Sequence, residues 1–203
     1  MKHSETVFLV DDEPALLKAL GRLLKAEGFA VQAFDSAMKF LSAPHNNGAG
    51  CILLDQSMPE MSGMELQQRL IQEDSALAVI FITGNGDIPM SVRAIKAGAV
   101  DFLTKPVKDK ELLAVIETAL EKSRAMLAER AEINQWKQRH AELSTREKEV
   151  LFHVVKGLPN KQIAANLGVV EQTIKVHRGR VMAKMGVESL AQLVLVAERL
   201  QLK

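Results

Sequence analysis

Short apolar runs alternate with longer amphipathic stretches in the first 125 residues of the chain. The runs have the length of strands and occupy residues 6–10, 29–34, 51–54, 78–82 and 100–103. Leucines between the first two runs recur at spacings of three and four, and Gly28 follows them where a helix would end. Five strand–helix units with nearly continuous apolar strands predict an α/β domain, with a parallel, doubly wound, flavodoxin-like five-stranded sheet covered by helices on both faces.

Polar residues and a proline mark where the next helices begin. Ser36 opens the second helix, and the third covers residues 61–71. Asp87 caps the fourth helix, which has Pro89 early in its first turn and ends at Gly98. These signals agree in spacing with the strand runs and support the same alternating architecture.

The last helix of this domain is expected to continue as a long helical linker. Neither Gly nor Pro occurs from residue 107 to residue 156. The apolar stripe that begins at Leu112 weakens in the stretch 129–140, where polar residues dominate. Within that stretch Ile133 and Trp136 are three residues apart, so they either face a partner helix or pack against their own domain.

The remaining residues predict an all-α domain of four short helices. Ser144 and Glu147 form a capping box that opens a helix at 145–156, and Asn160 caps a second helix at 161–167. A three-residue connection then leads to helices at 171–184 and 189–200, which is the helix-turn-helix arrangement. The predicted organisation is a sheet domain at 1–122, a linker at 123–141 and a helical domain at 142–203.

Composition describes an ordinary globular protein, with 47% hydrophobic and 25% charged residues in 203. A single cysteine excludes a disulfide framework and a cysteine-rich zinc site. No apolar run approaches the roughly 18 residues that span a bilayer, and charges interrupt the N-terminal apolar stretch. We therefore expect a cytoplasmic protein without a membrane partner.

The net charge of +1 conceals a difference between the two halves. Residues 1–125 hold 13 Lys and Arg against 17 Asp and Glu, a formal charge of −4. Residues 126–203 hold 13 against 8, a formal charge of +5. Either the difference is chance, or an acidic module precedes a basic module that binds phosphates.

Polar residues at the strand ends of the acidic half form a chemically coherent set. The first strand ends in Asp11, Asp12 and Glu13, and the third ends in Asp55. The fourth strand ends in Thr83 and the fifth is followed by Lys105, so these residues meet at the carboxyl edge of a parallel sheet. Clustered carboxylates favour Mg²⁺, and an aspartate held there can accept a phosphoryl group.

These motifs resemble the receiver domain of two-component response regulators, the CheY-like fold. The resemblance covers about 120 residues and rests on the acidic pair, Asp55 with its following Met58-Pro59 and Gly63, Thr83-Gly84, and Lys105-Pro106. It implies that Asp55 is the phosphoacceptor and that Lys105 pairs with the phosphoryl group. It also implies a cis peptide bond before Pro106.

The same resemblance assigns the metal and switch residues. Mg²⁺ is bound by Asp12, Asp55 and the Ser57 backbone carbonyl, while Asp11 acts through water. Thr83 and Phe102 are the switch residues, which rearrange on phosphorylation together with the face formed by the fourth helix, the fifth strand and the fifth helix.

Basic side chains on the predicted third helix of the C-terminal domain indicate contact with DNA, although a solvated helix face is the alternative. The sequence around them resembles the LuxR-type helix-turn-helix, and the whole chain resembles FixJ/NarL-type response regulators. Gly179 departs from the basic or helix-favouring residues common there. The predicted DNA-binding residues are Asn160, Lys161, Thr173, Lys175, Val176, His177, Arg178, Arg180 and Lys184.

The leading hypothesis is a phosphorylation-controlled transcription factor, an activator by resemblance, that is not a free-standing enzyme. A sensor histidine kinase phosphorylates Asp55, and the change controls homodimerisation through residues 189–200, binding to promoter DNA and contact with RNA polymerase. Two alternatives are a small aspartyl-phosphate hydrolase, for which the chain offers no cap domain, and a phosphorylation-independent DNA-binding protein with a degenerate receiver.

Overall fold

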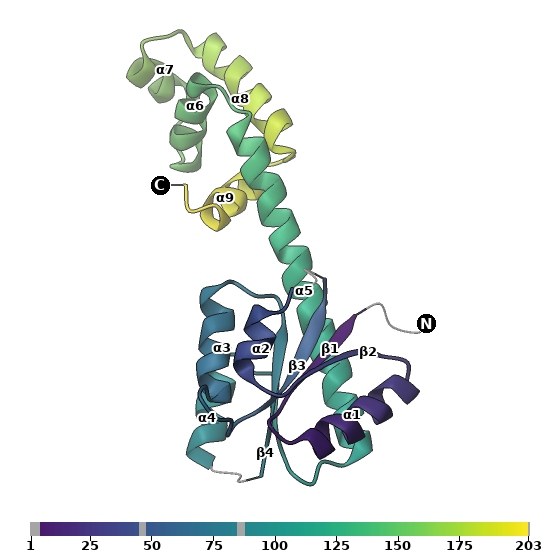
Figure 1. Ribbon diagram of the computed structural model, residues 1–203. Helices are drawn as coiled ribbons and strands as arrows, with labels where there is room; N and C mark the ends of the chain where they lie inside the picture. Colours follow the sequence, from purple (N-terminus) through teal and green to yellow (C-terminus); the bar gives the residue numbers. More distant parts are fainter. Residues whose placement is uncertain (1–4, 45–47, 85–87, 203) are drawn as a thin grey trace. The chain divides into compact units, whose positions relative to one another are not determined.

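The computed structural model describes residues 5–44, 48–84 and 88–202. The chain forms two compact units, Met1–Ala128 and Glu129–Lys203, each with its own hydrophobic core (Figure 1). Asp87, the predicted cap of the fourth helix, lies outside the described residues. Among the helices that are described, none combines the length and the apolar character needed to cross a membrane.

A five-stranded parallel sheet forms the centre of the first unit, with the strand order β2-β1-β3-β4-β5. Each strand begins and ends within one residue of the predicted run. This order reverses direction between β1 and β3, where the carboxyl ends of the strands border a crevice. The strands are β1 (Thr6–Val10), β2 (Ala30–Phe34), β3 (Gly50–Asp55), β4 (Ala78–Thr83) and β5 (Asp101–Thr104).

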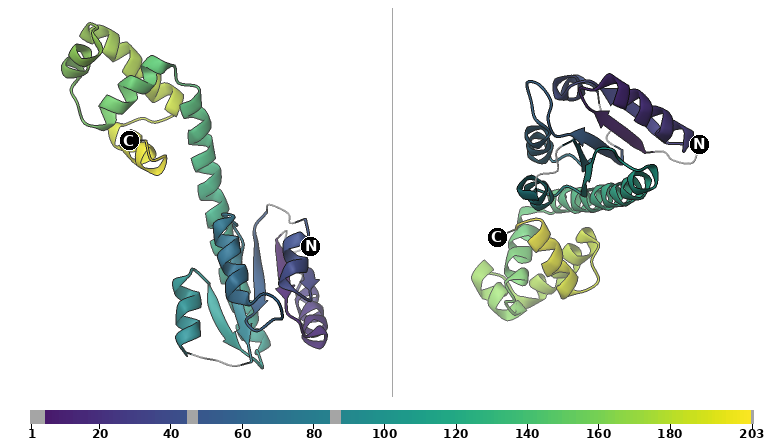
Figure 2. Two further views of the ribbon diagram at one scale, coloured as in Figure 1. Left: turned by 60° about the vertical axis from the view of Figure 1, so that its left-hand side comes forward. Right: turned by 90° about the horizontal axis from the view of Figure 1, so that it is seen from below.

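Helices cover both faces of this sheet, which confirms the doubly wound prediction (Figure 2). On one face, α1 (Pro14–Ala26) and the first turns of α5 (Asp109–Ala141) pack over one core cluster. On the other face, a second core cluster includes buried side chains of three further helices. These helices are α2 (Ala37–Ser42), α3 (Gly63–Gln72) and α4 (Ile88–Lys96).

Capping side chains set where two of these helices begin. The Ser36 hydroxyl accepts a hydrogen bond from the Lys39 amide at 3.3 Å, as expected for the start of α2. The third helix begins two residues later than predicted, at Gly63. Ser62 and Glu65 form a reciprocal capping box there, and this side-chain cap fixes the helix start more strongly than the apolar pattern does.

The second unit is a helix-turn-helix arrangement around a separate core. Between α7 and α8, Gly168 has a left-handed φ of 65° and ends the first of these helices. Buried side chains from all four helices meet in the core. The helices are α6 (Thr145–Val155), α7 (Asn160–Leu167), α8 (Glu171–Met185) and α9 (Leu190–Arg199).

Helix α5 is continuous from Asp109 to Ala141, so the linker is helical as predicted. Its last turns belong to the second unit, where Trp136 packs against the core and the Arg199 guanidinium carbon lies 5.7 Å from the indole. The sequence predicts that Trp136 either faces a partner helix or packs against its own domain, and in the structure it packs within its own unit.

Ser123 joins α5 to the sheet inside the first unit. This fully buried hydroxyl accepts a hydrogen bond from the Gly50 amide at 3.0 Å and donates one to the Ala76 carbonyl at 2.7 Å. Gly50 begins β3, and Ala76 lies just before β4. One side chain therefore satisfies the hydrogen-bonding requirement of two backbone groups at a position that is closed to solvent.

We predict that Ser123→Ala destabilises the first unit by about 1–3 kcal/mol, because it leaves a buried amide and a buried carbonyl without partners. Native-state hydrogen exchange of the β3 and β4 amides would measure the loss. Thr118→Ala is the control, since the exposed Thr118 hydroxyl bonds only the Ala114 carbonyl of its own helix. Equal protection in the Ser123→Ala variant and the wild type would contradict the prediction.

Candidate functional site

The predicted acidic site assembles at the carboxyl edge of the sheet. Asp11 follows β1, Asp55 ends β3 and Thr83 ends β4, while Lys105 follows β5. Because β1 and β3 are neighbours at the switch point, their carboxylates lie on the two sides of the crevice. Sequence segments that are nearly 100 residues apart therefore contribute to one site.

The ammonium group of Lys105 bridges the two buried carboxylates. Its Nζ lies 2.8 Å from Asp11 Oδ2 and 2.9 Å from Asp55 Oδ1. Asp11 and Asp55 are each 5% exposed, so water screens this cluster weakly. Glu13, at the exposed rim, adds a third carboxylate 3.5 Å from the same ammonium. The sequence places Glu13 at the same strand end as the acidic pair but indicates no role for it in the site.

Backbone amides hold both carboxylates in position. The Glu13 amide donates to Asp11 Oδ1 at 2.8 Å, and the Ser57 amide donates to Asp55 Oδ2 at 2.6 Å. Gly63 begins α3 directly against this loop, where a Cβ atom would overlap the Asp55 carbonyl oxygen. The glycine of the predicted motif thus permits a close approach between α3 and the end of β3.

Charge and burial oppose each other in this cluster. Burial raises the pKa of Asp11 above its usual value, and the nearby charge of Asp55 acts in the same direction, while the Lys105 hydrogen bond opposes both. Burial alone would lower the pKa of Lys105, but its hydrogen bonds to the two aspartates outweigh that effect and raise the pKa. The ammonium of Lys105 is therefore held in its charged form beside Asp11 and Asp55.

The donor set fits a hard divalent cation. Asp11, Asp12, Asp55 and the Ser57 carbonyl offer only oxygen atoms, and Asp12 is exposed at the rim. Mg²⁺ typically takes one or two carboxylates with water and phosphate oxygens, so it does not require a complete protein cage. In the described part of the chain, no group of three His, Cys, Asp or Glu side chains is arranged to bind a metal.

The predicted switch residues lie beside this cluster. Thr83 is buried, and its carbonyl accepts the Lys105 amide at 2.7 Å. Phe102 is half-buried on β5, with its ring centroid 6.0 Å from that of Phe81 on β4. The peptide bond between Lys105 and Pro106 is cis, as the resemblance implies.

The predicted DNA-binding residues differ in exposure along α8. Lys175, Val176 and Arg180 are exposed, as is Lys161 on α7. Three further predicted residues in the first turns of α8 are half-buried, namely Thr173, His177 and Arg178. An exposed surface with three cations from two helices of a helix-turn-helix is suited to phosphate contact.

Asn160 does not cap α7, contrary to the prediction. The cap position is Pro159, and Asn160 is already the first residue of the helix. Its side-chain oxygen instead accepts a hydrogen bond from Arg178 Nη1 at 3.2 Å. Pro159 has the extended backbone of a cap residue, with φ −70° and ψ 151°, but its side chain has no oxygen that could accept from the first amides of the helix. The side-chain amide of Asn160, one residue later, instead contacts a basic side chain of α8.

Lys184 has an internal partner that the sequence analysis missed. Its ammonium lies 2.7 Å from Oε2 of Glu147, which is 3% exposed, and it also donates to the Glu142 carbonyl at 3.2 Å. Glu147 completes the predicted capping box with Ser144. The Lys184 hydrogen bond, with support from the Ser144 amide, lowers the pKa of Glu147 to about 2. Contact of Lys184 with DNA stays a prediction.

Comparison with known proteins identifies a family for each unit. Residues 7–117 match "Response regulator receiver domain", and residues 141–197 match "Bacterial regulatory proteins, luxR family". The response regulator protein TodT of Pseudomonas putida is 43% identical over 199 residues, which is 98% of this chain and 88% of TodT. The transcriptional regulatory protein FixJ of Rhizobium meliloti is 44% identical over 192 residues, with 95% and 94% covered.

Two solved structures cover almost the whole chain. The response regulator StyR has a TM-score of 0.78 and 44% identity, covering 97% of this chain and 100% of StyR. Full-length FixJ from B. japonicum has a TM-score of 0.58 and 36% identity, with both chains covered fully.

The ion pair between the buried Glu147 and the exposed Lys184 generates a pH prediction for the second unit. Because the pKa of Glu147 is lowered from 4.5 to about 2, its ionised form contributes stability that is complete above pH 4.5 and is lost as the pH falls towards 2. Glu147→Gln should therefore be less stable than the wild type near neutral pH, and the difference should shrink in acid.

Urea unfolding followed by the fluorescence of Trp136, the single tryptophan, reports on this unit. Glu149→Gln is the matched control, because its exposed carboxylate pairs with Arg146 on the surface and should matter little. A difference between Glu147→Gln and the wild type that stays constant from neutral pH to about pH 3 would contradict the prediction.

Proposed function

Since the chain belongs to the response regulators that join a receiver domain to a LuxR-type DNA-binding domain, we propose that phosphorylation of Asp55 by a sensor histidine kinase controls its binding to promoter DNA. The observation that carries this proposal is the position of Asp55 at the end of β3, 2.9 Å from the Lys105 ammonium and opposite Asp11. The receiver occupies residues 1–122, the linker 123–141 and the DNA-binding domain 142–203.

Asp55 acts as the nucleophile in the phosphoryl transfer. A carboxylate oxygen forms a bond to phosphorus while the bond between phosphorus and the kinase histidine breaks, and the histidine nitrogen keeps the electron pair. Lys105 neutralises charge that develops on the transferred group, and the Ser57 amide keeps the carboxylate oriented. When bound by Asp12, Asp55 and the Ser57 carbonyl, with Asp11 acting through water, Mg²⁺ would supply further charge neutralisation.

The new phosphoryl group then changes the adjacent surface. A phosphorylated residue carries a charge of about −1.5 to −2 near neutral pH and three acceptor oxygens. The Thr83 hydroxyl rotates to donate to one of these oxygens, and Phe102 moves in the space that Thr83 leaves. Helix α4, which follows Thr83 in the chain, exposes Ile88, Val92 and Ile95 at helical spacing, and such an apolar stripe supports pairing of two receivers on this face.

Helix α8 enters the major groove of DNA, with the exposed Lys175, Val176 and Arg180 towards the duplex. Asn160 orients Arg178 for the same surface. The C-terminal helix, within 189–200, pairs with its copy so that a homodimer reads a two-fold symmetric site. Its exposed Leu190 and Leu195 supply apolar area for that contact. The bound dimer activates transcription through RNA polymerase.

We predict that Asp55→Asn is not labelled by acetyl phosphate and that its affinity for promoter DNA does not rise on treatment, because the amide is not a nucleophile. Phosphate-affinity electrophoresis and fluorescence anisotropy measure the two effects. Asp74→Asn is the matched control: the same chemical change at an exposed position with a φ of 51°, a conformation that asparagine tolerates. Labelling of Asp55→Asn at another residue, or steady turnover of a soluble phosphomonoester by the wild type, would contradict the assignment.

We further predict that Arg180→Ala weakens binding to mixed-sequence duplex DNA and lowers the slope of log affinity against log salt by about one, as expected for the loss of one phosphate contact. Anisotropy titrations at several salt concentrations measure both quantities. Lys137→Ala removes an exposed charge from α5 and serves as the control. The same loss in both variants would indicate general charge attraction instead of a contact made by α8.

A further inference from the structure

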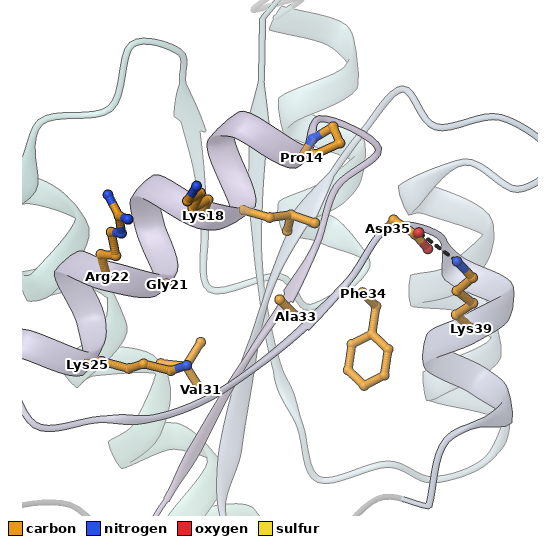
Figure 3. Close-up of a pocket in the computed structure, with 11 residues that line it drawn as sticks. Pro14, Lys18, Gly21, Arg22, Lys25, Val31, Ala33, Phe34, Asp35 and Lys39 are labelled. Carbon is orange, nitrogen blue, oxygen red and sulfur yellow. Dashed lines mark hydrogen bonds and ion pairs between the residues drawn. The ribbon is translucent and has the colours of Figure 1, made fainter.

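A groove of about 640 Å³ lies beside the sheet of the first unit, between α1 and β2 (Figure 3). Its apolar lining includes Leu17 from α1 together with Val31 and Phe34 from β2. Gly21 also borders it, and a Cβ built there would have only the Leu9 side chain within 4 Å, at 3.9 Å. The missing side chain in the middle of α1 therefore leaves open space in the groove.

The rim of this groove is cationic. Lys18, Arg22 and Lys25 follow one another along α1 at spacings of four and three, so they share one face of the helix (Figure 3). All three are exposed, and no ion pair joins them to an acidic side chain in the described part of the chain. The only acidic residue of the groove is Asp35, which pairs with Lys39 at 2.6 Å.

The floor of the groove borders an open sheet edge. Among the described strands β2 pairs only with β1, so the backbone groups on its other side face no further strand of the sheet. Ala30, Gln32 and Ala33 are exposed along it. Extended peptides bind such edges through main-chain hydrogen bonds, and alternate side chains enter adjacent pockets.

We propose that this groove binds an extended acidic segment of another protein, which adds to β2 as a strand and places its carboxylates against Lys18, Arg22 and Lys25. A second copy of the chain would bring the same cations to the edge and be repelled, so the charge favours a different, acidic partner. Nucleic acid would match the charge but has no peptide groups to pair with β2. None of the groove residues belongs to the phosphorylation or DNA-binding sets, so the proposal stands apart from both.

A fluorescein-labelled peptide of alternating Glu and Val is the probe, and anisotropy with the full chain measures its affinity. Arg22→Glu should weaken binding roughly tenfold or more, whereas Arg93→Glu, an equal reversal on the exposed surface of α4, should change it less than about twofold. Gly21→Met should also weaken binding about fivefold or more, since it fills the groove but keeps every cation. Methionine favours the helix more than glycine does, so this variant is expected to fold.

Hydrogen exchange distinguishes strand addition from adsorption by charge. Bound peptide should slow exchange of the Ala30–Phe34 amides. Binding without that protection, equal weakening by Arg22→Glu and Arg93→Glu, or no binding at about 1 mM peptide would each overturn the proposal. It would also be overturned if mixed-sequence duplex DNA, and not the peptide, lost affinity on Arg22→Glu.

Discussion

Two buried carboxylates, Asp11 and Asp55, lie on opposite sides of the crevice between β1 and β3, and the Lys105 ammonium holds them together. Like charges at low exposure repel strongly, and one ammonium leaves the cluster with net negative charge. The strand order creates this situation, because it brings the ends of two neighbouring strands to one crevice. A divalent cation and a phosphoryl group are chemically suited to a cluster of this kind, which links the fold to the proposed phosphorylation.

Lys105 also connects the two carboxylates to β4 and β5, the strands that carry the predicted switch residues Thr83 and Phe102. The amide of Lys105 donates to the Thr83 carbonyl, so the ends of β4 and β5 are joined at the residue whose ammonium contacts Asp55. Phe102 lies on β5 three residues before the lysine. The second unit has its own stabilising contacts, namely the ion pair between the buried Glu147 and Lys184 and the capping box that begins α6. The unit that contains Asp55 and the helix-turn-helix unit are therefore each stabilised by a hydrophobic core of their own.

Much of the fold and of the acidic site could be predicted from the sequence, because apolar runs define buried parallel strands and the residues that follow them must share one edge. Asp55 and Lys105 were found in this way. Contacts made by the packed chain were not predictable, since no local pattern encodes them. Ser123 joins α5 to β3 and to the segment just before β4, Asn160 orients a side chain of another helix, and Gly21 opens a groove beside β2.

We propose that a phosphoryl group on Asp55 is coupled to dimerisation and DNA binding. Beryllofluoride with Mg²⁺ mimics that group on an aspartate without turnover, so it tests the coupling directly. Analytical ultracentrifugation of the full chain, combined with a DNA-binding titration on the same samples, is the decisive measurement. We expect a shift towards a dimer and tighter DNA binding when both reagents are present. An unchanged sedimentation coefficient together with unchanged DNA affinity would contradict it.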